Sequence, residues 1–430
     1  MTHVAVIGGG PAGCAVARRL ALGGIRVTQF VSGTVAGREG LSRRTCELLR
    51  EDGFGDLAAV LTGPVPRGGH WGSGRSVAGE EWLADREQLA AEMRAGAAAA
   101  GAVMRDDLIE GIAGDYPEFR VRTRSGAEVT ATAVVDARGR RGAELHGPTL
   151  LALGQGFRTA APLPSGTAIH PMSWGWCWIV RNGPQLWIQL AGQPGDGRPE
   201  GWLARAAREL PELVSALKGA VSIGEPVARP SHARRSIAPA QPGLIRTGDA
   251  AVGLDPLSGQ GVYEALRGAR VAAAAVRSLI DGVDPAVVTR FLTERDDALW
   301  ERVVSTAAAF YAENTGIGAF WSNTAAAYRA LERSPVPIAT AIERRPVLDG
   351  DRIRERDVLV TAAQPRGVWQ VDGVSVVALI HYIQRVGNAT PSAAAAELAR
   401  PQAAVLAAAR WLRESGAWPD RVSQVISAGG

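Results

Sequence analysis

Lysine is almost absent from this chain of 430 residues. Only one of its 47 basic residues, Lys218, is a lysine, and all the others are arginines. Arginine stays protonated and is a poor nucleophile, so chemistry that needs a side-chain amine is excluded everywhere except at residue 218. The formal net charge of +4 is small for this length, and it does not indicate a nucleic-acid partner.

Cysteines and long apolar runs are also scarce. The three cysteines, Cys14, Cys46 and Cys177, show no CxxC spacing, so the sequence predicts neither a disulfide framework nor a metal site. Glycines interrupt the apolar N-terminal segment before it could form the core of a signal peptide. No uncharged apolar run reaches the ~18 residues that a membrane span requires. We therefore expect a cytoplasmic protein with reduced cysteines and no membrane partner.

The N-terminal residues follow the pattern of a dinucleotide-binding unit. Residues 3–9 predict a buried parallel strand, residues 11–24 a helix that stops at a glycine pair, and residues 25–31 a second strand. The turn before the helix carries a glycine fingerprint, whose residues are Gly8, Gly10, Pro11, Ala12 and Gly13. Its glycines permit a tight turn, approach of the backbone to a pyrophosphate, and close packing of helix on strand.

The second strand lacks one residue of the usual pattern. An acidic side chain at its end would bind the adenosine ribose, but residues 29–32 read Gln, Phe, Val and Ser. We expect recognition of the ribose through Ser32 or a backbone group instead.

A second glycine-rich region lies in the C-terminal half of the chain. Asp249 stands in TGDAA after an apolar strand, and PLSGQG follows at residues 256–261, where a helix starts. A carboxylate there can accept hydrogen bonds from a ribityl chain. The glycines let backbone N–H groups approach a ring that carries negative charge, such as a reduced flavin. These residues favour FAD as the dinucleotide.

Several motifs occur together in a fixed order, namely GGGPAG, AGREGLSRRTCELLRE, WLADREQL, AVVDARGRRG and GDAAVGLDPLSGQG. In this order they resemble the FAD-dependent monooxygenase and halogenase superfamily, over about residues 1–330. The resemblance implies an α/β fold, with a Rossmann-like FAD-binding domain of the glutathione-reductase (GR2) type and an inserted antiparallel-sheet substrate domain. It also implies FAD-binding residues beyond the glycine fingerprint, which are Arg38, Arg86, Asp249, Pro256, Gly259 and Gly261.

The expected domains are discontinuous in sequence. We assign residues 1–60, 82–145 and 235–285 to the FAD-binding domain, residues 61–81 and 146–234 to the substrate domain, and residues 286–345 to a helical connection. A proline- and charge-rich stretch at about residues 334–357 precedes a small helical, winged-helix-like domain at residues 346–430. Its predicted helices cover residues 376–386, 391–400 and 401–416.

The motif AVVDARGRRG bears on the source of electrons. Hydroxylases that bind NADPH often carry an adjacent Asp-Gly pair there, but in this chain Asp136 and Gly139 are separated. This form looks more like the halogenase and reductase branches. Electrons come either from NAD(P)H or from a separate flavin reductase.

Three tryptophans, Trp174, Trp176 and Trp178, alternate in the stretch SWGWCWIV at residues 173–180. Strand alternation predicts that all three lie on one face of a sheet. One interpretation is sheet core packed against a helix. The other is an aromatic wall over the flavin or the substrate, and its candidate residues are Trp71, Trp176 and Trp178. The stretch resembles the Trp-x-Trp-x-Ile motif of the halogenases, with Val180 at the isoleucine position.

Halogenases of this superfamily also use a lysine within their first hundred residues, and this chain has none there. We therefore expect hydroxylation of an aromatic ring by a flavin hydroperoxide, with O2 as co-substrate. The ring must lose a proton as it regains aromaticity. The candidate proton acceptors are His70, His170 and His232, and the sequence favours none of them.

The chain as a whole resembles one branch of the superfamily, the monooxygenases that hydroxylate protein-bound tryptophan in cysteine tryptophylquinone biogenesis. The substrate protein of that branch is the small subunit of quinohaemoprotein amine dehydrogenase. The resemblance implies a protein or peptide partner that carries the target tryptophan. Two alternatives stay open: a hydroxylase or halogenase of a free small aromatic such as an indole, and a non-catalytic escort protein with the flavin fold.

Overall fold

The computed structural model describes residues 2–33, 36–55, 57–72, 75–76, 78–140, 144–195, 201–238, 240–334, 337–387 and 389–416. The chain divides into two compact units. The first comprises Met1–Ile280 and Arg295–Arg333, and the second comprises Asp281–Glu294 and Ser334–Gly430. None of the described helices has both the length and the apolar character that crossing a membrane requires.

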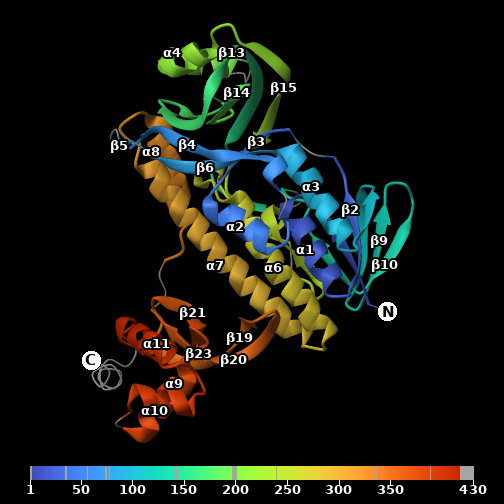
Figure 1. Ribbon diagram of the computed structural model, residues 1–430, viewed down its shortest axis with the longest axis vertical. Coiled ribbons are helices and arrows are strands. Elements are labelled where there is room, and N and C mark those ends of the chain that lie inside the picture. Colours follow the sequence, from blue (N-terminus) through green and yellow to red (C-terminus); the bar gives the residue numbers. More distant parts are fainter. Residues whose placement is uncertain are drawn as a thin grey trace. The chain divides into compact units, whose positions relative to one another are not determined.

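The first unit contains a five-stranded parallel sheet, of which Figure 1 labels β2. Its strand order is β17-β11-β1-β2-β7, and all neighbouring strands are parallel. The strands are β1 (His3–Ile7), β2 (Arg26–Val31), β7 (Val103–Asp106), β11 (Ala133–Asp136) and β17 (Leu244–Arg246). The strand β1 is buried along its whole length, as expected for a parallel strand covered on both faces. The predicted α/β fold with a parallel sheet is confirmed.

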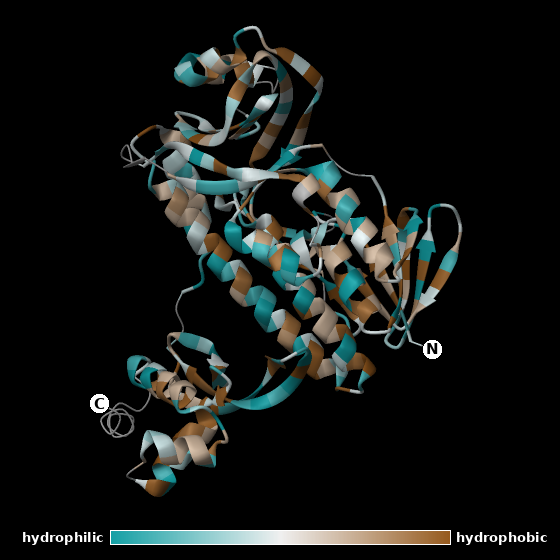
Figure 2. Ribbon diagram, in the orientation of Figure 1, coloured by the Kyte–Doolittle hydropathy of each residue, from teal (hydrophilic) through white to brown (hydrophobic). Residues whose placement is uncertain are grey.

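Helices and a small antiparallel sheet pack around the parallel sheet. The helix α1 (Pro11–Leu22) contacts α3 (Arg86–Ala99) and α6 (Gly261–Ile280). The strands β8 (Ile109–Asp115), β9 (Glu118–Thr123) and β10 (Glu128–Ala131) form an antiparallel sheet. Its Phe119 and Val121 share a buried cluster with Ala5 and Phe30 of the parallel sheet. Figure 2 shows many apolar residues in the strands near the N-terminus, whereas the helices carry both polar and apolar residues.

A second large sheet, of seven strands, contains the order β14-β13-β4-β6-β3, and β15 and β5 join it at β13 and β4. Its strands are β3 (Arg38–Leu41), β4 (Leu61–Trp71), β5 (Arg75–Ser76), β6 (Gly79–Asp85), β13 (Leu151–Met172), β14 (Gly175–Gly192) and β15 (Val221–Pro230). Between β14 and β15 lie α4 (Trp202–Glu209) and α5 (Pro211–Leu217). One face of this sheet packs on α4 and α5. The other packs on α7 (Pro285–Ala312) and α8 (Ala319–Arg329).

The three tryptophans of residues 173–180 do not share one face, so that prediction is wrong for Trp174. Met172 pairs with Gly175 across the β13–β14 hairpin, which leaves Trp174 in the turn. Its ring meets Trp202 of α4, with ring centroids 5.4 Å apart, and Arg205 lies 4.5 Å from its centroid. Trp176 packs in the cluster on the other face, and Trp178 packs against it. Strand alternation does not extend through a turn, because the backbone there is no longer pleated.

The second unit contains the three helices predicted for the C-terminal domain. They are α9 (Val376–Val386), α10 (Pro391–Glu397) and α11 (Gln402–Glu414). Thr390 caps α10, because its hydroxyl accepts a hydrogen bond from Ala393 N at 3.2 Å. The unit is not purely helical, however. An antiparallel sheet of β19 (Ala341–Asp349), β20 (Arg352–Thr361) and β21 (Gln364–Val368) precedes the helices, and β22 (Gln370–Val371) and β23 (Val374–Ser375) form a short ribbon.

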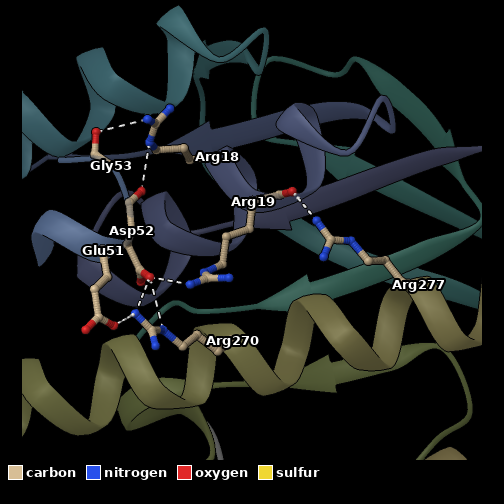
Figure 3. A network of polar contacts seen from close by, with 7 residues as sticks. All are labelled: Arg18, Arg19, Glu51, Asp52, Gly53, Arg270 and Arg277. Carbon is tan, nitrogen blue, oxygen red and sulfur yellow. Dashed lines mark hydrogen bonds and ion pairs between the residues drawn. The ribbon is translucent and has the colours of Figure 1, made fainter. Parts of the chain in front are cut away.

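An arginine–carboxylate network ties α1, α6 and the helix α2 (Arg43–Glu51) together (Figure 3). Asp52 lies just after α2, and its carboxylate pairs with Arg19 of α1 and with Arg270 of α6, whose Nη2 lies 2.7 Å away. Arg18 donates to the carbonyl oxygens of Asp52 and Gly53, both at 2.9 Å. The side chain of Asp52 is fully buried, so this network replaces the hydration of its charge.

Loss of the Asp52 carboxylate should destabilise the first unit. We expect Asp52→Ala to lower the free energy of unfolding by about 2–3 kcal/mol, because charge-assisted hydrogen bonds to two arginines are lost. Urea denaturation measures the change. Glu51→Ala is the matched control, since Glu51 pairs with the same Arg270 but its side chain is 61% exposed. Equal stability of Asp52→Ala and wild type would show that the network contributes nothing.

Candidate functional site

The glycine turn after β1 has the geometry of a dinucleotide cradle. Gly8 has φ +124°, and a side chain there would collide with the carbonyl of Ala137. A side chain at Gly13 would collide with the carbonyl of Gly8, which shows how closely α1 packs on β1. Beside Gly10, by contrast, the space around a Cβ position is open to 4 Å. The turn therefore leaves room for a phosphate group at the N-terminus of α1.

The end of β2 shows what replaces the missing acidic residue. Gln29 is buried, and its amide nitrogen donates to Gly8 O at 2.8 Å, so it braces the glycine turn and is not directed at a ribose. Ser32 is exposed at the end of the strand. The half-buried Arg94 of α3 lies beside Gly9, with its Cδ 3.4 Å from a Cβ position there. No pattern in the sequence indicates Arg94, because α3 approaches the turn only in the folded chain.

Arg140 holds the Asp249 segment in place, and sequence reasoning missed this residue. Asp249 lies in a single 3₁₀ turn (Gly248–Ala250), and its Oδ2 is 3.2 Å from Arg140 Nε. Arg140 also donates to the carbonyl oxygens of His232 at 2.5 Å and Leu254 at 2.7 Å. The feature of the sequence that could have indicated Arg140 is its position within the motif AVVDARGRRG.

Removal of the Arg140 guanidinium should weaken FAD binding. We expect Arg140→Met to raise the FAD dissociation constant about 10-fold, since Asp249 loses its orientation, and tenfold corresponds to about 1.4 kcal/mol. Fluorescence titration of the apoprotein with FAD measures this constant. The control is Arg124→Met, because the side chain of Arg124 is 67% exposed and pairs only with Glu110 among the described residues. An unchanged FAD dissociation constant for Arg140→Met would show that Arg140 stabilises the fold and does not contribute to FAD binding.

The loop at residues 256–261 begins at a buried carboxylate. Asp255 accepts hydrogen bonds from Leu257 N at 3.0 Å, Tyr311 OH at 3.1 Å and Tyr328 OH at 2.8 Å. Burial raises the pKa of Asp255. The loop, which includes Pro256, then turns through Gly259 at φ +62°, and α6 starts at Gly261. A Cβ at either glycine would meet open space, so this loop can approach a planar ring closely.

The two arginines implied by the resemblance lie at one end of the β3–β6 pair. Arg38 pairs with Asp85, and its Nη2 donates to Gln185 Oε1 at 2.7 Å. Arg86 pairs with Glu39, and its backbone nitrogen donates to Gly37 O at 3.1 Å. Both side chains are partly exposed. Both arginines lie at the same end of this strand pair, each ion-paired with a carboxylate, and their role towards FAD stays a prediction.

The candidate pocket tryptophans differ in burial. Trp176 is 2% exposed and packs in a cluster with Tyr311 and Trp321. Trp71 is 5% exposed and meets Trp321 edge-to-face at 5.2 Å between centroids. Trp178 is only half-buried. Of the three, Trp178 has the most surface available to a ligand.

Of the three candidate histidines, His170 lies on the opposite sheet face from Trp178, and His232 lies outside the strands of the sheet. His170 pairs across the hairpin with Cys177, which packs towards α4 and α5. Burial lowers the pKa of His170. His70 is exposed, with its ring 6.2 Å from that of His170. Both ring nitrogens of His232 have partners, Leu150 N and Glu144 Oε1, each at 3.4 Å. The role of these histidines as proton acceptors stays a prediction.

Comparison with known proteins assigns the fold. No protein-family model and no curated protein matches the chain. Solved structures that match include flavin-dependent halogenases and monooxygenases. The halogenase CmlS has a TM-score of 0.70 at 17% identity, over 84% of this chain and 85% of its own. The p-nitrophenol 4-monooxygenase PnpA from Pseudomonas putida has a TM-score of 0.58 at 19% identity, over 72% of this chain and 89% of its own.

A further structure matches over nearly the whole length of both chains. It is the peptidyl tryptophan dihydroxylase QhpG, described as essential for tryptophylquinone cofactor biogenesis. Its TM-score is 0.79 at 28% identity, over 96% of this chain and 99% of QhpG. The resemblance predicted from the sequence is confirmed, both for the superfamily fold and for the branch within it.

Proposed function

We propose that this chain is an FAD-dependent monooxygenase that hydroxylates the tryptophan side chain of a protein substrate during tryptophylquinone formation. The similarity to QhpG carries the proposal, because it covers 96% of the chain and so includes the C-terminal unit. CmlS and PnpA, which share the flavin fold, cover 84% and 72% of the chain.

The residues present fit FAD. The open space at Gly10 would receive the pyrophosphate, Asp249 would bind the ribityl chain, and the loop at residues 256–261 would face the ring system. The bound flavin, once reduced, would supply the activation of O2. The chain's own contribution is to orient the target ring, to exclude water and to accept the proton that the ring loses. Electrons come from NAD(P)H or from a separate flavin reductase.

The position of Lys218 supports hydroxylation over halogenation. This single lysine is exposed and directly follows α5, on the side of the large sheet that packs on α4 and α5. The half-buried Trp178 lies on the opposite face of that sheet. A lysine amine is therefore not available beside the aromatic residues of the candidate pocket.

Mass spectrometry tests this function. The protein is incubated with FAD, a reductant and O2, and is offered either a tryptophan-bearing substrate peptide or free tryptophan. We expect a mass increase of one or two oxygen atoms on the peptide only. Ready oxygenation of free indoles would instead support a small-molecule hydroxylase. Purified protein that stays colourless and cannot be reconstituted with FAD would support a non-catalytic escort.

A further inference from the structure

A buried carboxylate lies on the same sheet face as Trp178. Glu81 is in β6 and is 8% exposed. It stands two residues before Leu83, so both side chains point to the same face of the sheet. Leu83 forms a buried cluster with Val65 and Val180, and Trp178 packs against this cluster. The carboxylate of Glu81 therefore belongs to the sheet face of Trp178, whereas His170 lies on the opposite face.

The described neighbours of the Glu81 carboxylate are a hydroxyl group and a glycine. Its Oε1 accepts a hydrogen bond from the hydroxyl of Thr167, and its Oε2 lies beside Gly40, where any side chain would collide with it. Within the part of the chain that the structure describes, no lysine, arginine or histidine lies within ion-pair distance of Glu81. A buried carboxylate without a cation is costly and favours a functional role over a structural one.

The neighbours of Glu81 place it between two parts of the candidate site. Thr167 pairs directly with Val180 across β13 and β14, and Val180 is two residues from Trp178. Gly40 is two residues from Arg38 on β3, so both lie on one face of that strand. The carboxylate thus lies between the half-buried indole and the arginine implied to hold FAD.

We propose that Glu81 is the proton acceptor of the hydroxylation, an inference that rests on the proposed function. One atom of O2 forms a C–O bond with the substrate ring, and the other leaves as water, with two electrons from the reductant. The C–H bond at that carbon then breaks, and its electron pair restores the aromatic ring. Its proton passes to the Glu81 carboxylate and later to solvent. Gly40 leaves the space that the second carboxylate oxygen needs.

The test compares Glu81→Gln with Glu80→Gln in the full-length holoprotein. The glutamine keeps an oxygen for the Thr167 hydroxyl but cannot accept the ring proton. We expect oxygenation of the peptide to slow about 100-fold or more in Glu81→Gln, the usual contribution of a general base, while the FAD dissociation constant stays within about twofold. Glu80 is exposed on the opposite face of the same strand, so Glu80→Gln should match wild type.

An isotope effect separates proton transfer from a structural role. With ring-deuterated tryptophan in the peptide, wild type should show no primary effect on product formation, because loss of the proton is fast. Glu81→Gln should show one, because breakage of the C–H bond has become slow. Wild-type rates in Glu81→Gln, or a slow variant without an isotope effect, would overturn the proposal for Glu81 alone. Failure of the wild type to oxygenate any indole, peptide or free, would overturn it together with the proposed function.

Discussion

A Gly10→Ala variant should fold normally and bind FAD about 100-fold more weakly than wild type. The Cβ position at Gly10 meets nothing within 4 Å, so the methyl group costs the free protein no contact. It does occupy the space that the pyrophosphate needs if the turn binds a dinucleotide. Loss of one or two charge-assisted hydrogen bonds to the phosphates, at about 1.5–3 kcal/mol each, accounts for the expected factor.

Two further glycine variants make this result specific. Gly13→Ala forces a side chain against the carbonyl of Gly8, so it should lose stability as well as FAD affinity. Gly55→Ala adds a methyl group in open space on an exposed residue, and it should change neither quantity. For all three variants, FAD titration measures the dissociation constant and urea denaturation measures the free energy of unfolding. Wild-type affinity in Gly10→Ala would refute dinucleotide binding at this turn.

The features that could be predicted from the sequence are those encoded locally. The β1–α1–β2 unit follows from an apolar run, a glycine turn and a helix of fixed length. Helices α9, α10 and α11 follow from apolar periodicity and a Thr-Pro start, and the structure has them near the predicted bounds. Resemblance in the order of the motifs then gave the superfamily, which the solved structures confirm.

The features that could not be predicted depend on contacts between distant segments or on irregular patterns. The strands β19 and β20 carry many charged residues, such as ERR and RIRERD, so apolar alternation is weak there, and we assigned the region to a connection and a helical domain. Arg140 reaches Asp249 from 109 residues away, and Thr167 reaches Glu81 from 86 residues away. Neither pairing leaves a local pattern in the sequence.

Truncation of Trp176 and of Trp178 should have different consequences, although the two side chains are neighbours on one sheet face. Trp176→Ala should lower the free energy of unfolding by about 3–5 kcal/mol, because it leaves a cavity among the buried rings of Tyr311 and Trp321. Trp178 is half-buried, so Trp178→Ala should cost about half as much. Urea denaturation of both variants measures this difference.

Activity measurements on variants of Trp176 and Trp178 distinguish the two interpretations of these tryptophans, as sheet core or as an aromatic wall of the substrate pocket. Trp176→Phe and Trp178→Phe keep most of the packing, so both should fold and bind FAD as wild type does. If Trp178 stacks on the incoming indole, Trp178→Phe should raise the KM for the peptide more than Trp176→Phe does, because the smaller ring offers less stacking surface. If Trp178→Ala and Trp176→Ala both keep FAD binding and full turnover, the tryptophans serve only as sheet core. In that case the substrate ring must be held by other residues of this face, and Glu81 would remain a carboxylate buried there.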